Sequence, residues 1–242
     1  ELVIFNFVRE NAGKGRTCCL PLHTPESGSK VNRKLIEELI GPDGTDSAWH
    51  RVEMLGSACR RMYLKSWFTG NKIFFGNEQK IMLEDLPVAI QAHCACRHLL
   101  GLGGAYYHYF CNHNSLSTRY RPHKMEMLTA CFLSVEKILG KYGLSEKYRE
   151  RHLAWFLRYA AHSSLVNCFS PRNPAGFCGR WREVHGILQN PILRRAAQSD
   201  YLKHASKADR LLLCILRTRW TPLVYLFYRC YSCVLRKNER KQ

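Results

Sequence analysis

The sequence is poor in acidic residues. Its 242 residues contain 19 Asp and Glu against 37 Lys and Arg, which gives a formal net charge of +18 at pH 7. So much unpaired positive charge opposes compaction and favours an anionic partner: nucleic acid, a phosphorylated ligand or anionic lipid. Hydrophobic residues still make up 46% of the chain, so it is able to bury a core and is neither disordered nor fibrous.

Long hydrophobic runs are also missing. No stretch approaches the ~18 uncharged apolar residues that an ordinary membrane-spanning helix needs. No signal peptide opens the chain, and twelve cysteines in 242 residues fall below the ~8–10% that marks a disulfide scaffold. We therefore expect a reducing, cytoplasmic location. The chain starts directly on a buried-strand pattern at 2–8 without an initiator methionine, so we expect it to be the middle of a larger protein.

Hydrophobic periodicity predicts an α/β chain. In the first half, strand and helix patterns alternate, and the expected elements are strands at 2–8 and 105–111, helices at about 35–40 and 84–99, and a strand-like start at 56–59 before a short helix at 63–67. Three glycines, Gly101, Gly103 and Gly104, are expected to end the helix at 84–99.

The second half is expected to be helical throughout. Its helical patterns cover 124–142, 146–168 and, after a break rich in Pro and Gly at 170–179, a basic tail. We therefore predict two parts: an α/β domain over 1–123 and a helical C-terminal region over 124–242.

The tail over 201–242 is basic and amphipathic. It contains ten Lys and Arg and two Asp and Glu, interleaved with apolar side chains such as Trp220, Tyr225 and Leu235. This composition suits a helix in the headgroup region of an anionic membrane surface. A helix packed on its own domain is the second reading. Nucleic acid is the third, because no helix-turn-helix, zinc-finger or RNP-type motif accompanies the charge.

Cysteine and histidine are dense in one stretch, which contains His93, Cys94, Cys96, His98, His108, Cys111 and His113. Zinc favours these ligands, but Cys94 and Cys96 are two apart in a predicted helix, where their side chains point in different directions. We therefore expect buried free cysteines and no metal ligands within this chain. The Cys230-x-x-Cys233 pair has redox spacing, but it lies in an aromatic amphipathic pattern and is expected to be inert.

Three motifs occur in an order that is typical of one enzyme family. They are Gly56-Ser57-Ala58-Cys59-Arg60-Arg61-Met62-Tyr63, then Glu84-Asp85-Leu86-Pro87, then Tyr106-Tyr107-His108-Tyr109 followed by Asn114-Ser115-Leu116-Ser117. With this order and spacing, residues 2–124 resemble the C-terminal half of bacterial family 2 glycosyltransferases of GT-A fold. The resemblance implies a partial GT-A sheet followed by the helical region. It also implies inverting transfer of a sugar from a nucleotide-diphosphate sugar to a saccharide or lipid-linked acceptor, in cell-surface polysaccharide or lipopolysaccharide synthesis.

The resemblance implies that Asp85 is the catalytic base, which takes the proton from the acceptor hydroxyl. A carboxylate at a helix N-terminus faces the positive end of the helix dipole, which keeps it ionised. Glu84 is expected to orient a sugar hydroxyl or to hold Asp85. Tyr107, His108 and Ser115 are expected to shape the acceptor pocket. The alternative reading is that Glu84 and Asp85 only cap a helix and that the aromatic residues pack the strand.

The resemblance also implies Mg²⁺ or Mn²⁺ bound by an Asp-x-Asp motif, which would precede Glu1, so the isolated chain is expected to lack the nucleotide-binding part and to be inactive. Asp43 and Asp46 fit turn chemistry better than metal binding. Asn112 and His113 stand where the family often has Arg, so Arg119 and Arg121 are expected to contact phosphate instead. The family implies a peripheral location at the inner face of the plasma membrane. The alternative function is a non-catalytic basic binding or scaffold module.

Overall fold

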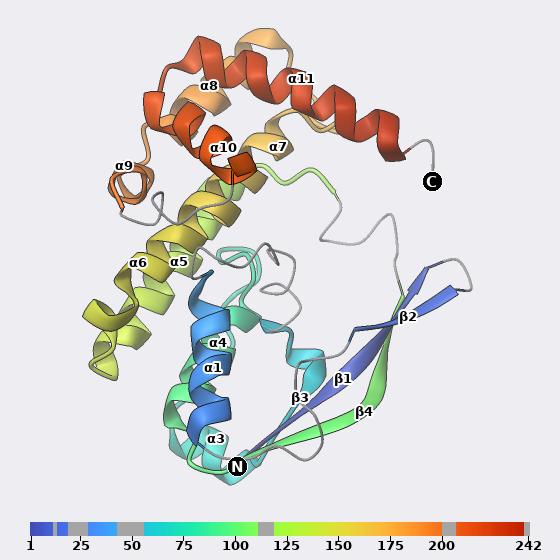
Figure 1. Ribbon diagram of the computed structural model, residues 1–242, viewed down its shortest axis with the longest axis vertical. Coiled ribbons are helices and arrows are strands. Elements are labelled where there is room, and N and C mark those ends of the chain that lie inside the picture. The colour runs from blue at the N-terminus through green and yellow to red at the C-terminus, as the bar shows by residue number, and fades with distance from the viewer. Residues whose placement is uncertain (12–13, 19–28, 43–55, 111–118, 200–206, 240–242) are drawn as a thin grey trace. The chain divides into compact units, whose positions relative to one another are not determined.

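The computed structural model of the chain describes residues 1–11, 14–18, 29–42, 56–110, 119–199 and 207–239 (Figure 1). These residues form a mixed α/β structure, as the sequence predicts. The chain divides into two compact units. Unit 1 takes the described residues within 1–41, 48–119 and 130–148, and unit 2 takes those within 42–47, 120–129 and 149–242.

Unit 1 contains a four-stranded sheet built around its first strand. The strands are β1 (Leu2–Asn11), β2 (Lys14–Cys18), β3 (Arg61–Tyr63) and β4 (Leu99–Phe110). On one edge of β1, β3 pairs antiparallel with its start and β2 antiparallel with its end. On the other edge, β4 runs parallel to β1 along its length (Figure 1). The predicted strand at 2–8 is therefore the central strand of the sheet.

The helices of unit 1 include α1 (Ser29–Ile40), α3 (Lys65–Gly70) and α4 (Asp85–Ala95), and a single 3-10 turn, η1 (Ala58–Arg60), precedes β3. The periodic residues expected on one face of α1 are all buried: Leu35, Ile36, Leu39 and Ile40. α1 lies beside α4, because the Asn32 side-chain amide donates hydrogen bonds to the carbonyls of His93 and Cys96 at 2.9 and 3.4 Å (Figure 1).

The rest of the described chain is helical. Its elements are α5 (Lys124–Lys141), α6 (Ser145–Trp155), the π-helical segment η2 (Phe156–Ala161), α7 (His162–Cys168), α8 (Phe177–Leu188), α9 (Pro191–Ala197), α10 (Lys207–Thr218) and α11 (Thr221–Glu239). The helical patterns predicted over 124–142 and 146–168 are confirmed, the second with a π-helical segment inside it. The basic tail holds two helices, α10 and α11.

Two local expectations were wrong. α4 ends at Ala95, because Cys96 already has extended backbone angles, and Gly101, Gly103 and Gly104 lie within β4 instead of ending the helix. In β4 the carbonyl of Gly103 accepts a hydrogen bond of 2.9 Å from the Asn6 side chain, where the pairing with β1 shifts register. The 56–59 segment is not a strand either, since the 3-10 turn starts at Ala58.

Among the described residues, no helix is long and apolar enough to cross a membrane. The described cysteines are free, and they differ in burial: Cys131 and Cys168 are buried, Cys94 and Cys96 half-buried, and Cys59, Cys178, Cys214, Cys230 and Cys233 exposed. Burial raises the pKa of Cys94 to about 12 and that of Cys96 to about 11, so both thiols stay protonated at neutral pH.

His93 on α4 is completely buried. Its Nδ1 lies 2.6 Å from the Asn32 side-chain oxygen, which is an acceptor, so Nδ1 carries the proton. Its Nε2 is buried without a hydrogen-bond partner among the described residues. Loss of water, reinforced by the positive charge of Arg61, holds the pKa of His93 well below its ordinary value. The folded protein therefore keeps this imidazole neutral.

This burial predicts a pH dependence of stability. Below pH ~6.5 the unfolded chain binds a proton at His93 that the folded chain does not. The free energy of unfolding should therefore fall as the pH decreases, by up to about 1.4 kcal/mol per pH unit from this residue. Urea unfolding between pH 7 and pH 5 should show a smaller decrease in the free energy of unfolding for His93→Gln than for the unmodified protein. The matched control is His98→Gln, whose side chain is 82% exposed, and equal slopes for all three proteins would contradict the assignment.

Candidate functional site

Asp85 is the first residue of α4, and its carboxylate reaches out of that helix. The Asp85 Oδ2 accepts a hydrogen bond of 3.0 Å from the backbone N–H of Ala58 in η1. The preceding residue, Glu84, occupies the N-cap position but makes no side-chain capping hydrogen bond. Leu83 has a φ of +60°, which turns the chain into the helix. The carboxylate of Asp85 therefore joins two segments that are 27 residues apart in the sequence.

The sheet register explains why η1 lies next to Asp85. β3 runs antiparallel to β1, with Arg61 opposite Ile4, so residues before Arg61 continue toward the carboxyl end of β1. Arg60 fixes this placement: its Nε donates a hydrogen bond of 3.1 Å to the carbonyl of Phe5, and its guanidinium lies 4.7 Å from the centre of the Phe7 ring. Arg60 is itself buried, so a charged side chain anchors the turn to β1.

Gly56, which opens the first motif, lies beside the start of α4. A Cβ at Gly56 would lie 3.4 Å from Leu86 Cδ1 and 3.6 Å from the Leu86 Cα, both ordinary van der Waals distances. Gly56 is buried, so the first motif packs directly against the second.

Positive charge and a hydroxyl lie near the Asp85 carboxylate. Arg61 is buried, and the loss of water lowers the pKa of its guanidinium, while the nearby Tyr63 and Asp85 side chains partly restore it. Its Nη1 donates a hydrogen bond of 2.7 Å to the carbonyl of Ser57. Burial raises the pKa of the Tyr63 hydroxyl, and the charge of Asp85 raises it further. The hydroxyl of Tyr63 therefore stays protonated at neutral pH.

Tyr107 lies near the same site because it contacts η1. It lies in β4 opposite Phe7, and a side-chain hydrogen bond between Tyr107 and Cys59 raises the pKa of the tyrosine hydroxyl. Cys59 follows Ala58 directly, so the segment that holds Asp85 also meets Tyr107. The Tyr107 side chain remains 37% exposed and is available to a ligand. This cluster lies toward the carboxyl ends of the parallel strands β1 and β4, the edge at which α/β sheets commonly bind ligands.

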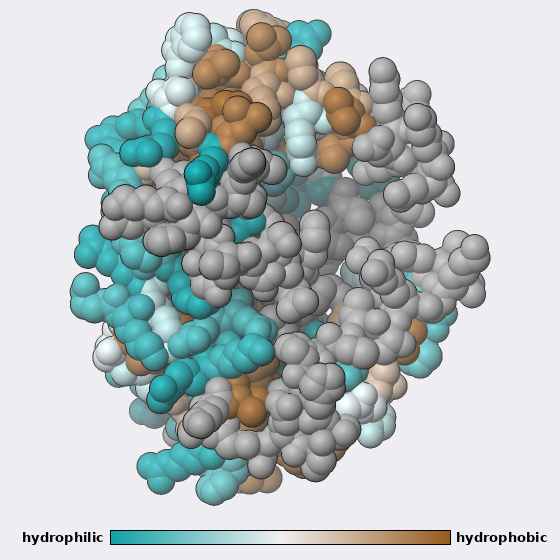
Figure 2. Space-filling model, in the orientation of Figure 1, coloured by the Kyte–Doolittle hydropathy of each residue, from teal (hydrophilic) through white to brown (hydrophobic). Residues whose placement is uncertain are grey.

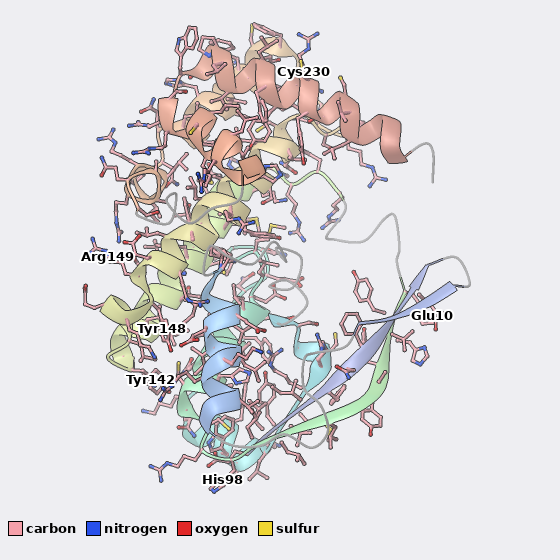
Figure 3. The ribbon with its side chains drawn as sticks, in the orientation of Figure 1. Glu10, His98, Tyr142, Tyr148, Arg149 and Cys230 are labelled. Atoms are coloured by element: carbon pink, nitrogen blue, oxygen red, sulfur yellow. The ribbon has the colours of Figure 1, made fainter. Side chains whose placement is uncertain are left out.

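His108 has a different environment. Successive residues of a strand point to opposite faces, so His108 lies on the other face of the sheet from Tyr107. Its Nδ1 lies 2.7 Å from Oε1 of Glu10, which is near the far end of β1 (Figure 3). Both side chains are partly exposed, so this cross-strand contact contributes little to stability. His108 is not brought to the Asp85 cluster.

The other residues expected from the sequence are distributed as follows. Burial, and to a smaller degree the charge of Glu84, raises the pKa of the Cys131 thiol in α5, so Glu84 lies near α5. Arg119 is exposed in unit 1, whereas Arg121 belongs to unit 2, where its backbone exchanges two hydrogen bonds with the Asn167 side chain. Ser115, Asp43, Asp46, Asn112 and His113 lie outside the described residues.

Three participants were not found from the sequence: the Ala58 amide, the Arg61 guanidinium and the Tyr63 hydroxyl. A backbone amide carries no signal in the sequence. Arg61 and Tyr63 lie two residues apart in the first motif, and only the placement of β3 in the sheet brings both side chains near Asp85.

The divalent metal that the resemblance implies finds no donor set in this part of the chain. Mg²⁺ and Mn²⁺ prefer several oxygen ligands, above all carboxylates. Within the described ranges, no group of three or more His, Cys, Asp or Glu side chains is close enough to hold a metal ion. The Asp85 carboxylate instead accepts a hydrogen bond from the Ala58 amide and lies near the Arg61 guanidinium.

The site therefore consists of one carboxylate that is held by a backbone amide, with a buried guanidinium and two phenols nearby. Comparison of the chain with models of known protein families found no match, and comparison with curated proteins found none.

Proposed function

We propose that this chain carries the acceptor side of an inverting glycosyltransferase of GT-A type, with Asp85 as the general base. The observation that carries the proposal is the placement of Asp85: a carboxylate at the N-terminus of α4, fixed by the Ala58 amide and beside the buried Arg61. The ordered motifs that suggest the family supply three of the elements around it, namely η1, the start of α4 and β4.

The proposed reaction uses Asp85 for one proton transfer. The oxygen of an acceptor hydroxyl attacks the anomeric carbon of the donor sugar, and the bond from that carbon to the diphosphate oxygen breaks. The hydroxyl proton moves to a carboxylate oxygen of Asp85, and the nucleoside diphosphate leaves with the bonding electrons. Asp85 Oδ2 is held by Ala58, which leaves Oδ1 for the acceptor. Tyr107, which is half-exposed beside this site, would contact the acceptor sugar.

The test is a transfer assay with a panel of nucleotide sugars and saccharide acceptors, in the presence of Mg²⁺ or Mn²⁺. It is run on this 242-residue chain and on any longer protein that contains it. Mass spectrometry of the acceptor should show the added sugar for at least one donor. The absence of transfer, donor hydrolysis and nucleotide binding in every protein tested would overturn the proposal and favour a basic binding module.

We also propose that α10 and α11 contact an anionic membrane surface. Large apolar side chains are exposed here, with Leu211 62%, Trp220 62%, Leu226 61% and Val234 57% exposed. Exposed arginines stand among them, including Arg210, Arg217 and Arg229. In the space-filling view, hydrophobic residues gather over the part of unit 2 that contains these helices (Figure 2). An exposed apolar and cationic surface suits the headgroup region of anionic lipid.

Trp220→Ala is expected to weaken binding to vesicles of equal parts phosphatidylglycerol and phosphatidylcholine by about tenfold, since burying a large apolar side chain contributes ~1.5–3 kcal/mol. Vesicle co-sedimentation measures this change, and binding should decrease at high salt. Phe74→Ala is the control, because Phe74 is 70% exposed but belongs to unit 1. Equal losses in both variants, or equal binding to pure phosphatidylcholine, would contradict the proposal.

A further inference from the structure

Unit 2 contains a pocket that the proposed reaction does not use. It has a volume of about 280 Å³ and lies at the N-terminal end of α8, against α11, which runs beside α8 (Figure 1). Its lining residues are Phe169, Ala175, Gly176, Phe177, Arg180, Tyr225 and Arg229. The lining combines three aromatic rings with two guanidinium groups.

The aromatic part of the lining contains two buried rings and one exposed ring. Phe169 and Tyr225 are buried, and their rings meet edge-to-face with centroids 5.0 Å apart. Phe177 packs against Tyr225 at 5.3 Å, yet 59% of Phe177 is exposed. An exposed ring held in place by a buried ring provides a surface on which a planar or apolar group can pack without ordering a mobile side chain.

Arg180 is held in this lining by a hydrogen bond to a backbone carbonyl. Its Nη2 donates a hydrogen bond of 3.1 Å to the carbonyl of Asn173. The Asn173 side chain in turn donates to Glu183 Oε2 at 3.0 Å, and the Tyr120 hydroxyl donates to Oε1 of the same carboxylate at 3.1 Å. Both oxygens of Glu183 are therefore engaged by uncharged groups. Burial of the phenol, followed by its hydrogen bond to Glu183, raises the pKa of Tyr120 to about 12.

The guanidinium groups of Arg180 and Arg229 have N–H donors available to a ligand. Arg180 Nε is buried without a hydrogen-bond partner among the described residues. Arg229 is exposed on α11, and no carboxylate in the described part of the chain lies within ion-pair distance of either arginine. The first turn of α8 adds partial positive charge, since Gly176 at its N-cap offers no side-chain acceptor. An anion in the pocket would face positive charge from two helices.

We propose that this pocket binds a phosphate monoester whose phosphate meets Arg180 and Arg229 and whose planar or apolar group packs on Phe177. Two arginines match a dianionic phosphate better than a single carboxylate charge, because guanidinium groups bind phosphate oxygens with paired hydrogen bonds. The volume suits one ring and one phosphate group. The inference uses only residues of unit 2 and does not depend on glycosyl transfer.

Phenyl phosphate is the probe for the test, and isothermal titration of the 242-residue chain measures its binding. We expect saturable binding that Arg229→Gln weakens by at least about tenfold, the range of a lost charge-assisted hydrogen bond. Arg229 is exposed, so this variant should fold normally. The control is Arg217→Gln, which removes an exposed arginine of α10 that does not line the pocket and should leave the affinity unchanged.

A second variant separates the two halves of the ligand. Phe177→Ala should weaken phenyl phosphate binding severalfold and leave the weaker binding of inorganic phosphate unchanged. Uridine monophosphate and dihexanoyl phosphatidate then distinguish a nucleotide from a lipid headgroup as the source of the phosphate, and tighter binding of either supports the proposal. The proposal is overturned if phenyl phosphate does not bind saturably, or if Arg229→Gln and Arg217→Gln bind it equally well. It is also overturned if phenol binds as tightly as phenyl phosphate.

Discussion

Asp85→Asn is expected to lower the rate of sugar transfer by about 10²–10⁴-fold, the usual contribution of a general base. Asparagine has nearly the same shape as aspartate, and its side-chain oxygen can still accept the hydrogen bond from the Ala58 amide. What is lost is the negative charge and with it the ability to take the acceptor proton. The turnover number should therefore fall, while the affinity for the nucleotide-sugar donor and the midpoint of thermal unfolding change little.

Two further substitutions test whether the loss of transfer is specific to the Asp85 carboxylate. Glu84→Gln changes the neighbouring carboxylate, whose charge acts on Cys131, and should reduce transfer by much less than Asp85→Asn. Glu78→Gln changes an exposed carboxylate in the turn before α4 and should leave transfer unaffected. If Asp85→Asn retains the turnover number of the unmodified protein, Asp85 is not the base. If it loses donor binding and transfer together, its role is structural.

The sequence predicted the elements with strong periodicity. The apolar residues of α1 repeat at helical spacing and are buried together, and the long pattern over 124–142 forms α5. The opening strand is recognisable from its run of apolar residues, interrupted only by Asn6, which is typical of a central strand. These elements follow local rules, because the spacing of their own residues decides which face is buried.

The elements that were missed depend on distant partners. Glycine commonly ends a helix, so by local propensity alone the glycines after α4 predict a helix stop. In the structure they lie in β4, where pairing with β1 outweighs local propensity. The same applies to the site: the sequence marks Glu84 and Asp85 as a pair, but only the structure shows that Asp85 bonds to the distant Ala58 amide.

Phe7→Ala is expected to have the largest effect on stability, a loss of about 3–5 kcal/mol in the free energy of unfolding. The Phe7 side chain is 1% exposed on the central strand β1, so its removal leaves a cavity where the sheet meets η1. A loss of this size is a large part of the ~5–15 kcal/mol that stabilises an ordinary domain. Phe110→Ala is the matched control on β4, because Phe110 is 69% exposed, and it should change stability by less than ~0.5 kcal/mol. Urea unfolding measures both changes, and similar losses in the two variants would contradict the assigned burial.

Phe7→Ala should also disturb the candidate site, because the ring supports Arg60. The Arg60 guanidinium packs on Phe7 and bonds to the Phe5 carbonyl, and this contact holds the turn whose Ala58 amide binds Asp85. In Phe7→Leu the cavity is smaller, so the fold should survive while the cation–π contact is lost. Transfer measured at a temperature where Phe7→Leu remains folded should be reduced, with the donor affinity retained. Full turnover in folded Phe7→Leu would show that Asp85 is positioned independently of the Arg60 contact.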